Sequence, residues 1–284
     1  LNVEKMESLL VGECAPPPKL GKQTAGCHAV AGRWIRAALH YACTGEAESG
    51  LLQQFVSSPG LLACVNRNGD SLIGIALLMR KPETAQLLVD LTARYFAGVL
   101  DHRSVAKETL LMLALSHDGP AHREVIRQLV LRDPEQVYTR YDAYGKNAFH
   151  HCAEDAGLEA LQVLLDSLTE ATMATNGGFR LRPLHRAFRM PDRFGWTPVH
   201  YLVRRDRADM LQLMQQFCSN SSVWLELRVR ARELGGRRQT PLELATDLGC
   251  QQAREFLLAS DQVRDQLEWD ADESQNATAV QLLQ

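Results

Sequence analysis

The strongest constraint on the fold is a short motif that returns along the chain. In its clearest copy, Asp192-Arg-Phe-Gly195 precedes Thr197-Pro-Val-His200. The last position of the motif serves as a marker, and its six copies fall at His40, Gly74, Met112, His150, His200 and Glu243. Each copy begins a short helical stretch, and a second stretch rich in Leu follows. Because a lone helix pair cannot cover its apolar face, such units stack and each buries its neighbour's face.

The copies follow D-x-x-G-x-T-P-L-H-x-A, a pattern that resembles the ankyrin repeat of about 33 residues. The markers lie 34, 38, 38, 50 and 43 residues apart, so the array is irregular. We predict an all-α solenoid of about six helix-turn-helix units with short hairpin loops, covering residues 31–260 with an insertion at about 170–190. Within that insertion, we interpret Arg182-Pro-Leu-His-Arg-Ala187 as a turn of helix in a loop and not as a seventh repeat.

Local patterns inside the units agree with this fold. Thr at a helix start caps it, and Pro is tolerated in the first turn. The second stretch of the fourth unit carries one apolar helical face, made by Leu158, Leu161, Leu164, Leu165 and Leu168. Small residues lie two or three positions after most markers and let neighbouring helices approach closely, namely Ala42, Ala76, Ala114, Ala153 and Ala245.

The two flanks differ from the array. Residues 1–30 hold Pro16-Pro17-Pro18 and several Gly, which predicts a linker or extension. Residues 261–284 carry six acidic residues against Arg264 alone, which predicts a mobile acidic tail. The longest uncharged apolar run, Leu72–Met79, is too short for a bilayer, which needs roughly 20 residues, so we expect no membrane partner.

The seven cysteines are odd in number and include no C-x-x-C pair, which indicates reduced thiols in a cytoplasmic or nuclear protein. Cys14 and Cys27-His28 offer three possible zinc ligands, but their spacing fits no standard site. We therefore expect no metal and no cofactor.

The sequence also argues against catalysis. His40, His150 and His200 recur at the repeat period, so each is expected to hold its own hairpin to its helix by a hydrogen bond. His151 and Cys152 are adjacent helical residues about 100° apart, so His151 is badly placed to activate the thiol. We predict no catalytic residue, no small-molecule substrate and no enzyme.

The hairpin tips are the better candidates for a function, because the residues around the Gly of each motif are expected to project from the turn. The predicted partner-binding residues here are Arg67, Asn68, Asp70, Tyr144, Lys146, Arg193, Phe194, Trp196, Arg237 and Arg238. Trp, Tyr and Arg are enriched at binding hot spots. Trp196 is the best single anchor, and the alternative is that it packs against the insertion.

Positive charge gathers in residues 179–238, which contain thirteen Arg, no Lys and five acidic residues. Such a stretch attracts carboxylates or phosphates. An acidic protein, nucleic acid and the chain's own tail compete as its partner, and a solvated face is the remaining interpretation. The absence of stacking aromatics or a groove-reading helix, with a pI near 6.3, argues against nucleic acid.

The order of the motifs resembles a narrower family. Ala38-Leu-His-Tyr-Ala-Cys-Thr-Gly-Glu46 resembles A-L-x-D-Y-A-x-T-G-D, and Asn68-Gly-Asp-Ser71 resembles an N-G-D-S/T opening. Met190-Pro-Asp-Arg-Phe-Gly-Trp-Thr-Pro-Val-His200 resembles M-P-D-x-x-G-x-x-P-V-H. Over roughly residues 37–258 the chain is similar to the inhibitory ankyrin half of a Relish-like NF-kappaB precursor, kin to the IκB inhibitors. Gly74, Met112 and Glu243 depart from the family's usual His.

This resemblance implies an inhibitor that binds a Rel-homology dimer, masks its nuclear-localisation segment and DNA-binding surface, and retains it in the cytoplasm. Glu46, Glu48 and Asp70 would meet the basic segment. The tail would oppose the DNA-binding cleft through Asp265, Glu268, Asp270, Asp272 and Glu273, unless it serves solubility alone. The alternative is a general ankyrin adaptor that binds an acidic protein through its Arg- and Trp-rich face.

Overall fold

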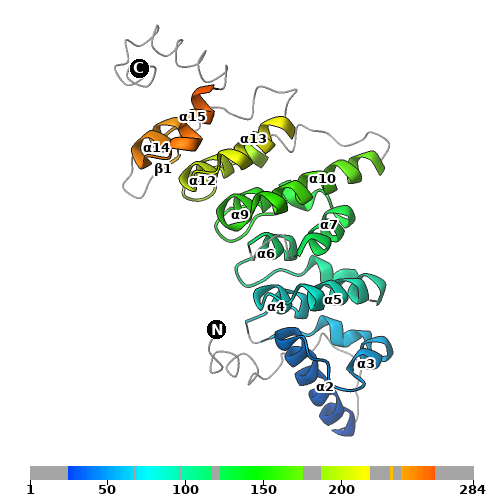
Figure 1. Ribbon diagram of the computed structural model, residues 1–284. Coiled ribbons are helices and arrows are strands. Elements are labelled where there is room, and N and C mark those ends of the chain that lie inside the picture. Colours follow the sequence, from blue (N-terminus) through cyan, green and yellow to red (C-terminus); the bar gives the residue numbers. More distant parts are fainter. Residues whose placement is uncertain are drawn as a thin grey trace. The chain divides into compact units, whose positions relative to one another are not determined.

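The computed structural model describes residues 25–66, 68–95, 97–116, 122–174, 187–217, 231–232 and 238–259 (Figure 1). Helices make up most of this part of the chain, and turns and hairpins join them. One antiparallel pair of two-residue strands is also described, β1 (Ala231–Arg232) and β2 (Arg238–Gln239). The chain forms two compact units, unit 1 (Leu1–Pro134) and unit 2 (Glu135–Gln284).

Unit 1 stacks helix pairs in two layers. Its inner helices α2, α4 and α6 pack on one another in sequence, and its outer helices α3, α5 and α7 do the same. Its elements are α2 (Ala25–Thr44), α3 (Leu51–Ser57), η1 (Pro59–Ala63), α4 (Leu72–Leu78), α5 (Pro82–Tyr95), η2 (Ala97–Asp101), α6 (Leu110–Ser116) and α7 (Arg123–Arg132). Isolated bridges join Val65 to Ser71 and Arg103 to Thr109, so a hairpin precedes α4 and α6.

Unit 2 repeats the same arrangement. The inner helices α9, α12 and α14 pack in sequence, and the outer helices α10, α13 and α15 pack beside them. Its helices are α8 (Gln136–Thr139), α9 (Ala148–Asp155), α10 (Leu158–Ala174), α12 (Pro198–Arg204), α13 (Ala208–Phe217), α14 (Pro241–Leu248) and α15 (Gln251–Ala259). The described residues of the two units thus hold six inner–outer helix pairs, as the sequence predicts.

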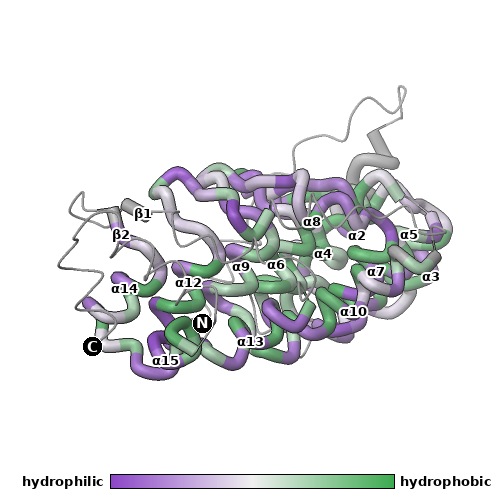
Figure 2. Tube along the Cα trace, turned by 90° about the horizontal axis from the view of Figure 1, so that it is seen from above, coloured by the Kyte–Doolittle hydropathy of each residue, from purple (hydrophilic) through white to green (hydrophobic). Residues whose placement is uncertain are grey.

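The core lies between the layers and depends on close helix packing. The alanines that follow the markers are buried in both units, at Ala42, Ala76, Ala114, Ala153 and Ala245. Figure 2 shows hydrophobic residues along α4 and α6, whose short inner helices are apolar almost throughout. No helix of the described residues is long and apolar enough to cross a membrane.

Three details differ from the sequence-based expectation or lie beyond it. Helix α2 begins at Ala25, so helix already replaces the expected linker at residues 25–30. Leu158 is 37% exposed because it is the first residue of α10, whereas Leu161, Leu164, Leu165 and Leu168 are buried as predicted. Residues 187–189 form a helical turn, while Arg182–Arg186 lie outside the described residues.

Candidate functional site

The marker residues occupy the third position of each inner helix from α4 to α14, where a side chain can close the helix start. The backbone N–H of Asn147 donates to His150 Nδ1 at 3.1 Å, and that of Thr197 donates to His200 Nδ1 at 3.3 Å. At the third such helix start, the Glu243 carboxylate accepts the backbone N–H of Thr240 at 2.7 Å. These are capping boxes. His and Glu share the position because each offers an acceptor there.

The two buried histidines also tie successive repeats together. His150 Nε2 donates to the carbonyl of Trp196 at 3.1 Å, and His200 Nε2 donates to the carbonyl of Gln239 at 3.2 Å. Both rings are fully buried. Burial lowers the pKa of His150 to about 3, so its neutral ring is the folded form. The predicted hydrogen bond between helix and hairpin is present, but each ring holds the hairpin of the next repeat and not its own.

His40 does not share that role, and the prediction for it is wrong. It is exposed, and its carbonyl accepts a hydrogen bond from the Thr44 hydroxyl at 2.9 Å. The reason is that His40 lies far inside the 20-residue α2, so no helix start is present for its ring to cap.

Two buried aspartates shape the hairpins of unit 2. Asp142 Oδ1 accepts the N–H groups of Tyr144 and Lys146, both at 2.8 Å. Asp192 Oδ1 accepts those of Phe194 and Trp196 at 2.8 and 2.9 Å. The second oxygen of Asp142 faces His151 Nε2 at 3.2 Å. Burial raises the pKa of Asp142, but the hydrogen bond with His151 and those from the backbone outweigh it, and the net shift is downward.

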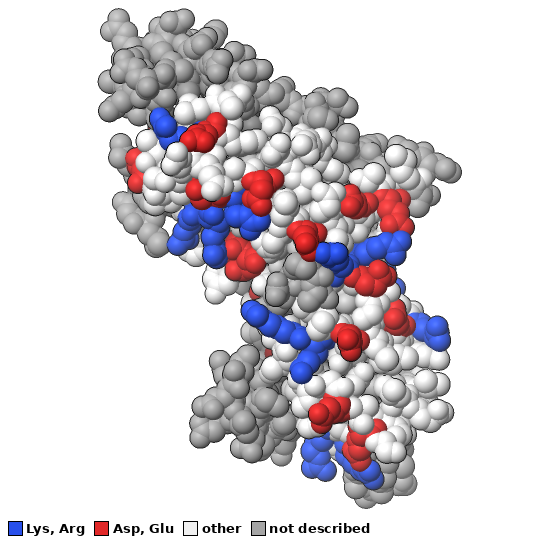
Figure 3. Space-filling view, in the orientation of Figure 1, with Lys and Arg blue, Asp and Glu red and all other residues white. Residues whose placement is uncertain are grey.

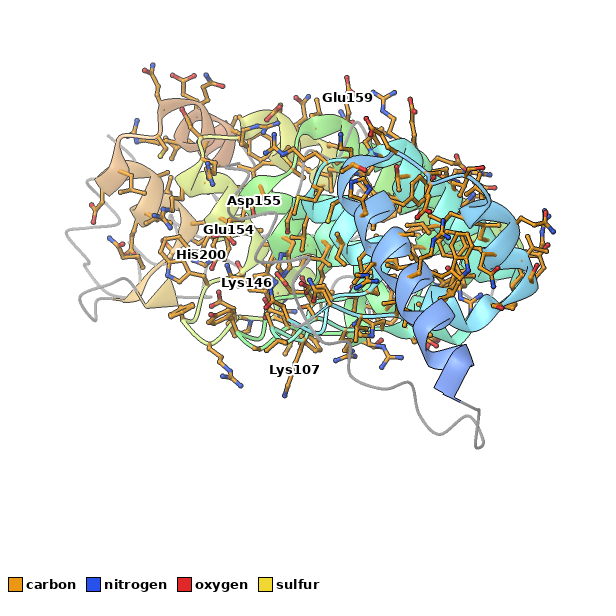
Figure 4. The ribbon with its side chains drawn as sticks, turned by 90° about the horizontal axis from the view of Figure 1, so that it is seen from below. Lys107, Lys146, Glu154, Asp155, Glu159 and His200 are labelled. Atoms are coloured by element: carbon orange, nitrogen blue, oxygen red, sulfur yellow. The ribbon has the colours of Figure 1, made fainter. Side chains whose placement is uncertain are left out.

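In four of the repeats, the residue five positions before the marker turns the hairpin through the left-handed backbone region. Gly69, Gly145 and Gly195 have φ of 76°, 80° and 82° at this position, and Lys107 has 63°. Lys107 therefore replaces the glycine of the motif in the third repeat. Its neighbour Val105 is 78% exposed, and Lys107 itself projects from the ribbon in Figure 4. Sequence reasoning missed both residues, although counting back from Met112 would have found them.

The hairpin tips of unit 2 bring two aromatic rings together. Tyr144 and Phe194 stack with ring centroids 6.3 Å apart and an interplanar angle of 22°. The Arg193 N–H donates to the Tyr144 carbonyl at 2.8 Å, which fixes one tip to the next. Each ring remains 52% exposed, and Arg193 beside them is also exposed. An aromatic pair held by its backbone and open to solvent is the structure's best candidate for recognition.

Trp196 does not project from its turn, and the expectation that it anchors a partner from an exposed position is wrong. Only 9% of it is exposed. Its ring packs on Tyr201 with centroids 5.4 Å apart, and the Arg204 guanidinium lies 5.6 Å from it. Gly195 has a φ of 82° and turns the backbone between Phe194 and Trp196, so the two side chains take different environments.

Unit 2 also carries cationic side chains on α12 and on the hairpin before α9. Arg204 and Arg205 at the end of α12 are exposed, and Arg205 approaches Asp155 at 3.8 Å. Lys146 is half-buried, pairs with Glu154 and lies 4.8 Å from the centre of the Tyr201 ring (Figure 4). Figure 3 shows blue side chains gathered over this side of α9 and α12. The Lys146 ammonium group thus already has contacts within unit 2, whereas Arg193 and Arg204 are exposed to solvent.

The predicted residues of unit 1 have mixed surroundings. Glu46 and Asn68 are exposed. Glu48 pairs with Arg33, and Asp70 accepts a hydrogen bond from Asn66 Nδ2 at 2.9 Å. Other predicted residues lie wholly outside the described part of the chain, namely Arg67, Arg237, Asp265, Glu268, Asp270, Asp272 and Glu273, and Arg238 is described only as backbone in β2.

Cys152, the possible nucleophile considered from the sequence, is not placed for catalysis. Cys152 is buried, and burial raises the pKa of its thiol to about 12. His151, its neighbour, faces Asp142. In the described residues no group of three or more His, Cys, Asp or Glu could hold a metal ion.

Comparison with solved structures fits the two-layer repeat. The chain is similar to a chain of the complex between the predatory endopeptidase Bd0816 from Bdellovibrio bacteriovorus and immunity protein Bd3460. The TM-score is 0.53 at 15% identity, covering 79% of this chain and 97% of that one. The chain is also similar to the ankyrin repeat protein EF0377, with a TM-score of 0.51 at 15% identity. That match covers 79% of this chain and 98% of EF0377. The chain has the ankyrin-repeat fold. No family model and no curated protein matches the sequence.

Proposed function

We propose that this chain is a non-catalytic protein-binding module that recognises its partner through the hairpin tips of unit 2. The observation that carries this proposal is the solvent-open stack of Tyr144 and Phe194. Aromatic side chains at hot spots lose little conformational entropy on binding and remove much apolar surface from water. The buried histidines and aspartates support a non-catalytic role, because their polar atoms already hold the hairpins.

We further propose that the partner is a Rel-homology dimer, retained in the cytoplasm as by an IκB-like inhibitor. The support is the order of repeat motifs, which resembles the inhibitory half of an NF-kappaB precursor. Exposed Glu46 in unit 1 offers a carboxylate to a basic segment, and Arg193 in unit 2 offers a cation to an acidic one. Charges of both signs on one module would set the orientation of a partner more than the affinity.

A second candidate is a general adaptor for an acidic protein. The cationic group Arg193, Arg204 and Arg205 favours it, because guanidinium groups bind carboxylates in a bidentate manner. Both candidates use the same surface of unit 2. They differ in whether a Rel-homology dimer binds.

Titration calorimetry of the full chain with purified Rel-homology dimers tests the proposal. The double variant Y144A/F194A should weaken binding at least about tenfold, since a truncated hot spot costs roughly 1–2 kcal/mol or more. Tyr95 offers a matched control, because it is an aromatic residue of unit 1 that is 37% exposed. The Y95A variant should bind like the parent chain.

The outcomes separate the candidates. Absence of binding at micromolar concentrations of every Rel-homology dimer would reject the inhibitor proposal. Equal affinity of Y144A/F194A and the parent chain would reject the hairpin tips as the binding site. Thermal unfolding followed by circular dichroism checks that each variant is folded before its affinity is measured.

A further inference from the structure

The exposed surface of unit 2 combines aromatic and cationic groups. We call it the hairpin patch and define it as Tyr144, Arg193, Phe194, Arg204 and Arg205. The two rings are stacked, Arg193 adjoins them, and Arg204 lies over Trp196 of the same hairpin. Such a patch fits a peptide that carries an aromatic side chain with carboxylates on both sides.

The chain contains a segment of this chemistry. Residues 267–273 read Leu-Glu-Trp-Asp-Ala-Asp-Glu, so Trp269 has Glu268 and Asp270 on its two sides and two further acids follow. Residues 261–284 as a whole carry six acidic residues and one Arg. The charge is opposite to that of the hairpin patch, and Trp269 offers the ring that Tyr144 and Phe194 can accept.

The end of α15 lies within reach of the patch. Helix α15 reverses on α14 after a turn at Gly249 and Cys250, and the two have nine and eight residues. At about 1.5 Å per residue, α15 therefore ends level with the start of α14, which is the hairpin side of the stack. Helix α15 also packs on α12, and its Ala253 N–H donates to Asp206 Oδ1 at 2.7 Å. The nine residues from Ala259 to Glu268 span up to roughly 30 Å, against about 10 Å between packed helices.

We propose that residues 267–273 bind the hairpin patch of their own chain when no partner is present. Tethering supplies an effective concentration in the millimolar range, so a weak peptide contact suffices for occupancy. The corollary, that a protein partner displaces this segment, rests on the proposed function. The segment then competes with the partner within the same chain, so a higher concentration of partner is needed for binding.

Nuclear magnetic resonance of the free full chain tests the proposal directly. Backbone amides of residues 267–273 should have order parameters of about 0.85 in the parent chain and below about 0.6 in R193Q/R204Q/R205Q. The matched control R36Q/R94Q/R123Q removes the same charge from exposed residues of unit 1 and should leave the segment ordered. Should the first variant fail to fold, E268Q/D270N/D272N/E273Q changes only the segment and should release it equally.

Four outcomes are decisive. Order parameters below about 0.6 in the parent chain would overturn the proposal. Order that grows with protein concentration would also overturn it, because the segment would then bind a second copy. Adding a Rel-homology dimer should release residues 267–273. An ordered segment in a chain that binds no such dimer would reject the proposed function and leave this inference standing.

Discussion

Protonation of His150 should destabilise the folded chain as the pH falls. Its pKa is about 3 in the folded state and near 6.5 in an unfolded chain, because burial disfavours the charged ring. Between these values the unfolded state binds more protons, so the free energy of unfolding decreases as the pH is lowered. Lowering the pH from 7.5 to 5.0 removes about 2 kcal/mol through this one residue.

The variant H150Q isolates this contribution. Gln at the third helical position can still accept the Asn147 N–H, as in a capping box, but it does not titrate. Other groups, including Asp142 with its lowered pKa, contribute to both proteins and cancel in the comparison. The parent chain should therefore lose about 2 kcal/mol more than H150Q between pH 7.5 and 5.0.

Urea unfolding followed by circular dichroism at pH 7.5, 6.0 and 5.0 gives both free energies. The two units of the chain require that the transitions be fitted separately if they do not coincide. Equal losses in the two proteins would refute the reasoning, because the His150 ring would then accept a proton in the folded state at little cost.

Two further substitutions test the hairpins. Lys107→Gly should raise the free energy of unfolding by about 0.5–1 kcal/mol, because Lys107 has φ 63° where a non-glycine residue is strained; the urea midpoint measures it. Asp192→Ala should cost about 3 kcal/mol, because two backbone N–H groups and the Tyr201 hydroxyl lose their acceptor. The exposed Asp209, paired with Arg207, is the control, and Asp209→Ala should change thermal unfolding by no more than about 0.5–1 kcal/mol.

The repeat fold could be predicted from the sequence because the marker has a fixed place at the start of an inner helix. Every inner helix from α4 to α14 starts two residues before its marker, whatever residue stands there. His150 and Glu243 accept a backbone N–H at that start, and at Gly74 the Ser71 hydroxyl alone caps the helix. His40 is the exception because α2 starts well before it and continues through it. The motif carries no information about helix length, so this difference could not be predicted.

The candidate site could be predicted only in part. Tyr144, Arg193 and Phe194 are exposed at the tips, as their place in the turn indicates. Trp196 follows the same turn but returns to the core, because backbone rotation at Gly195 and the contact with Tyr201 decide its direction. The spacing of residues in the sequence predicts neither the backbone rotation at Gly195 nor the contact with Tyr201. The contact between Tyr144 and Phe194 joins residues 50 positions apart, so it depends on stacking of successive repeats.

Photo-crosslinking shows directly whether the hairpin tips of unit 2 touch a protein partner. A benzophenone amino acid placed at position 194 replaces the exposed Phe194 ring by another aromatic group, and the same group at position 95 is the control. We predict a covalent adduct with a Rel-homology dimer from position 194 and none from position 95. Adducts from position 95 alone, or equal adducts from both positions, would contradict it.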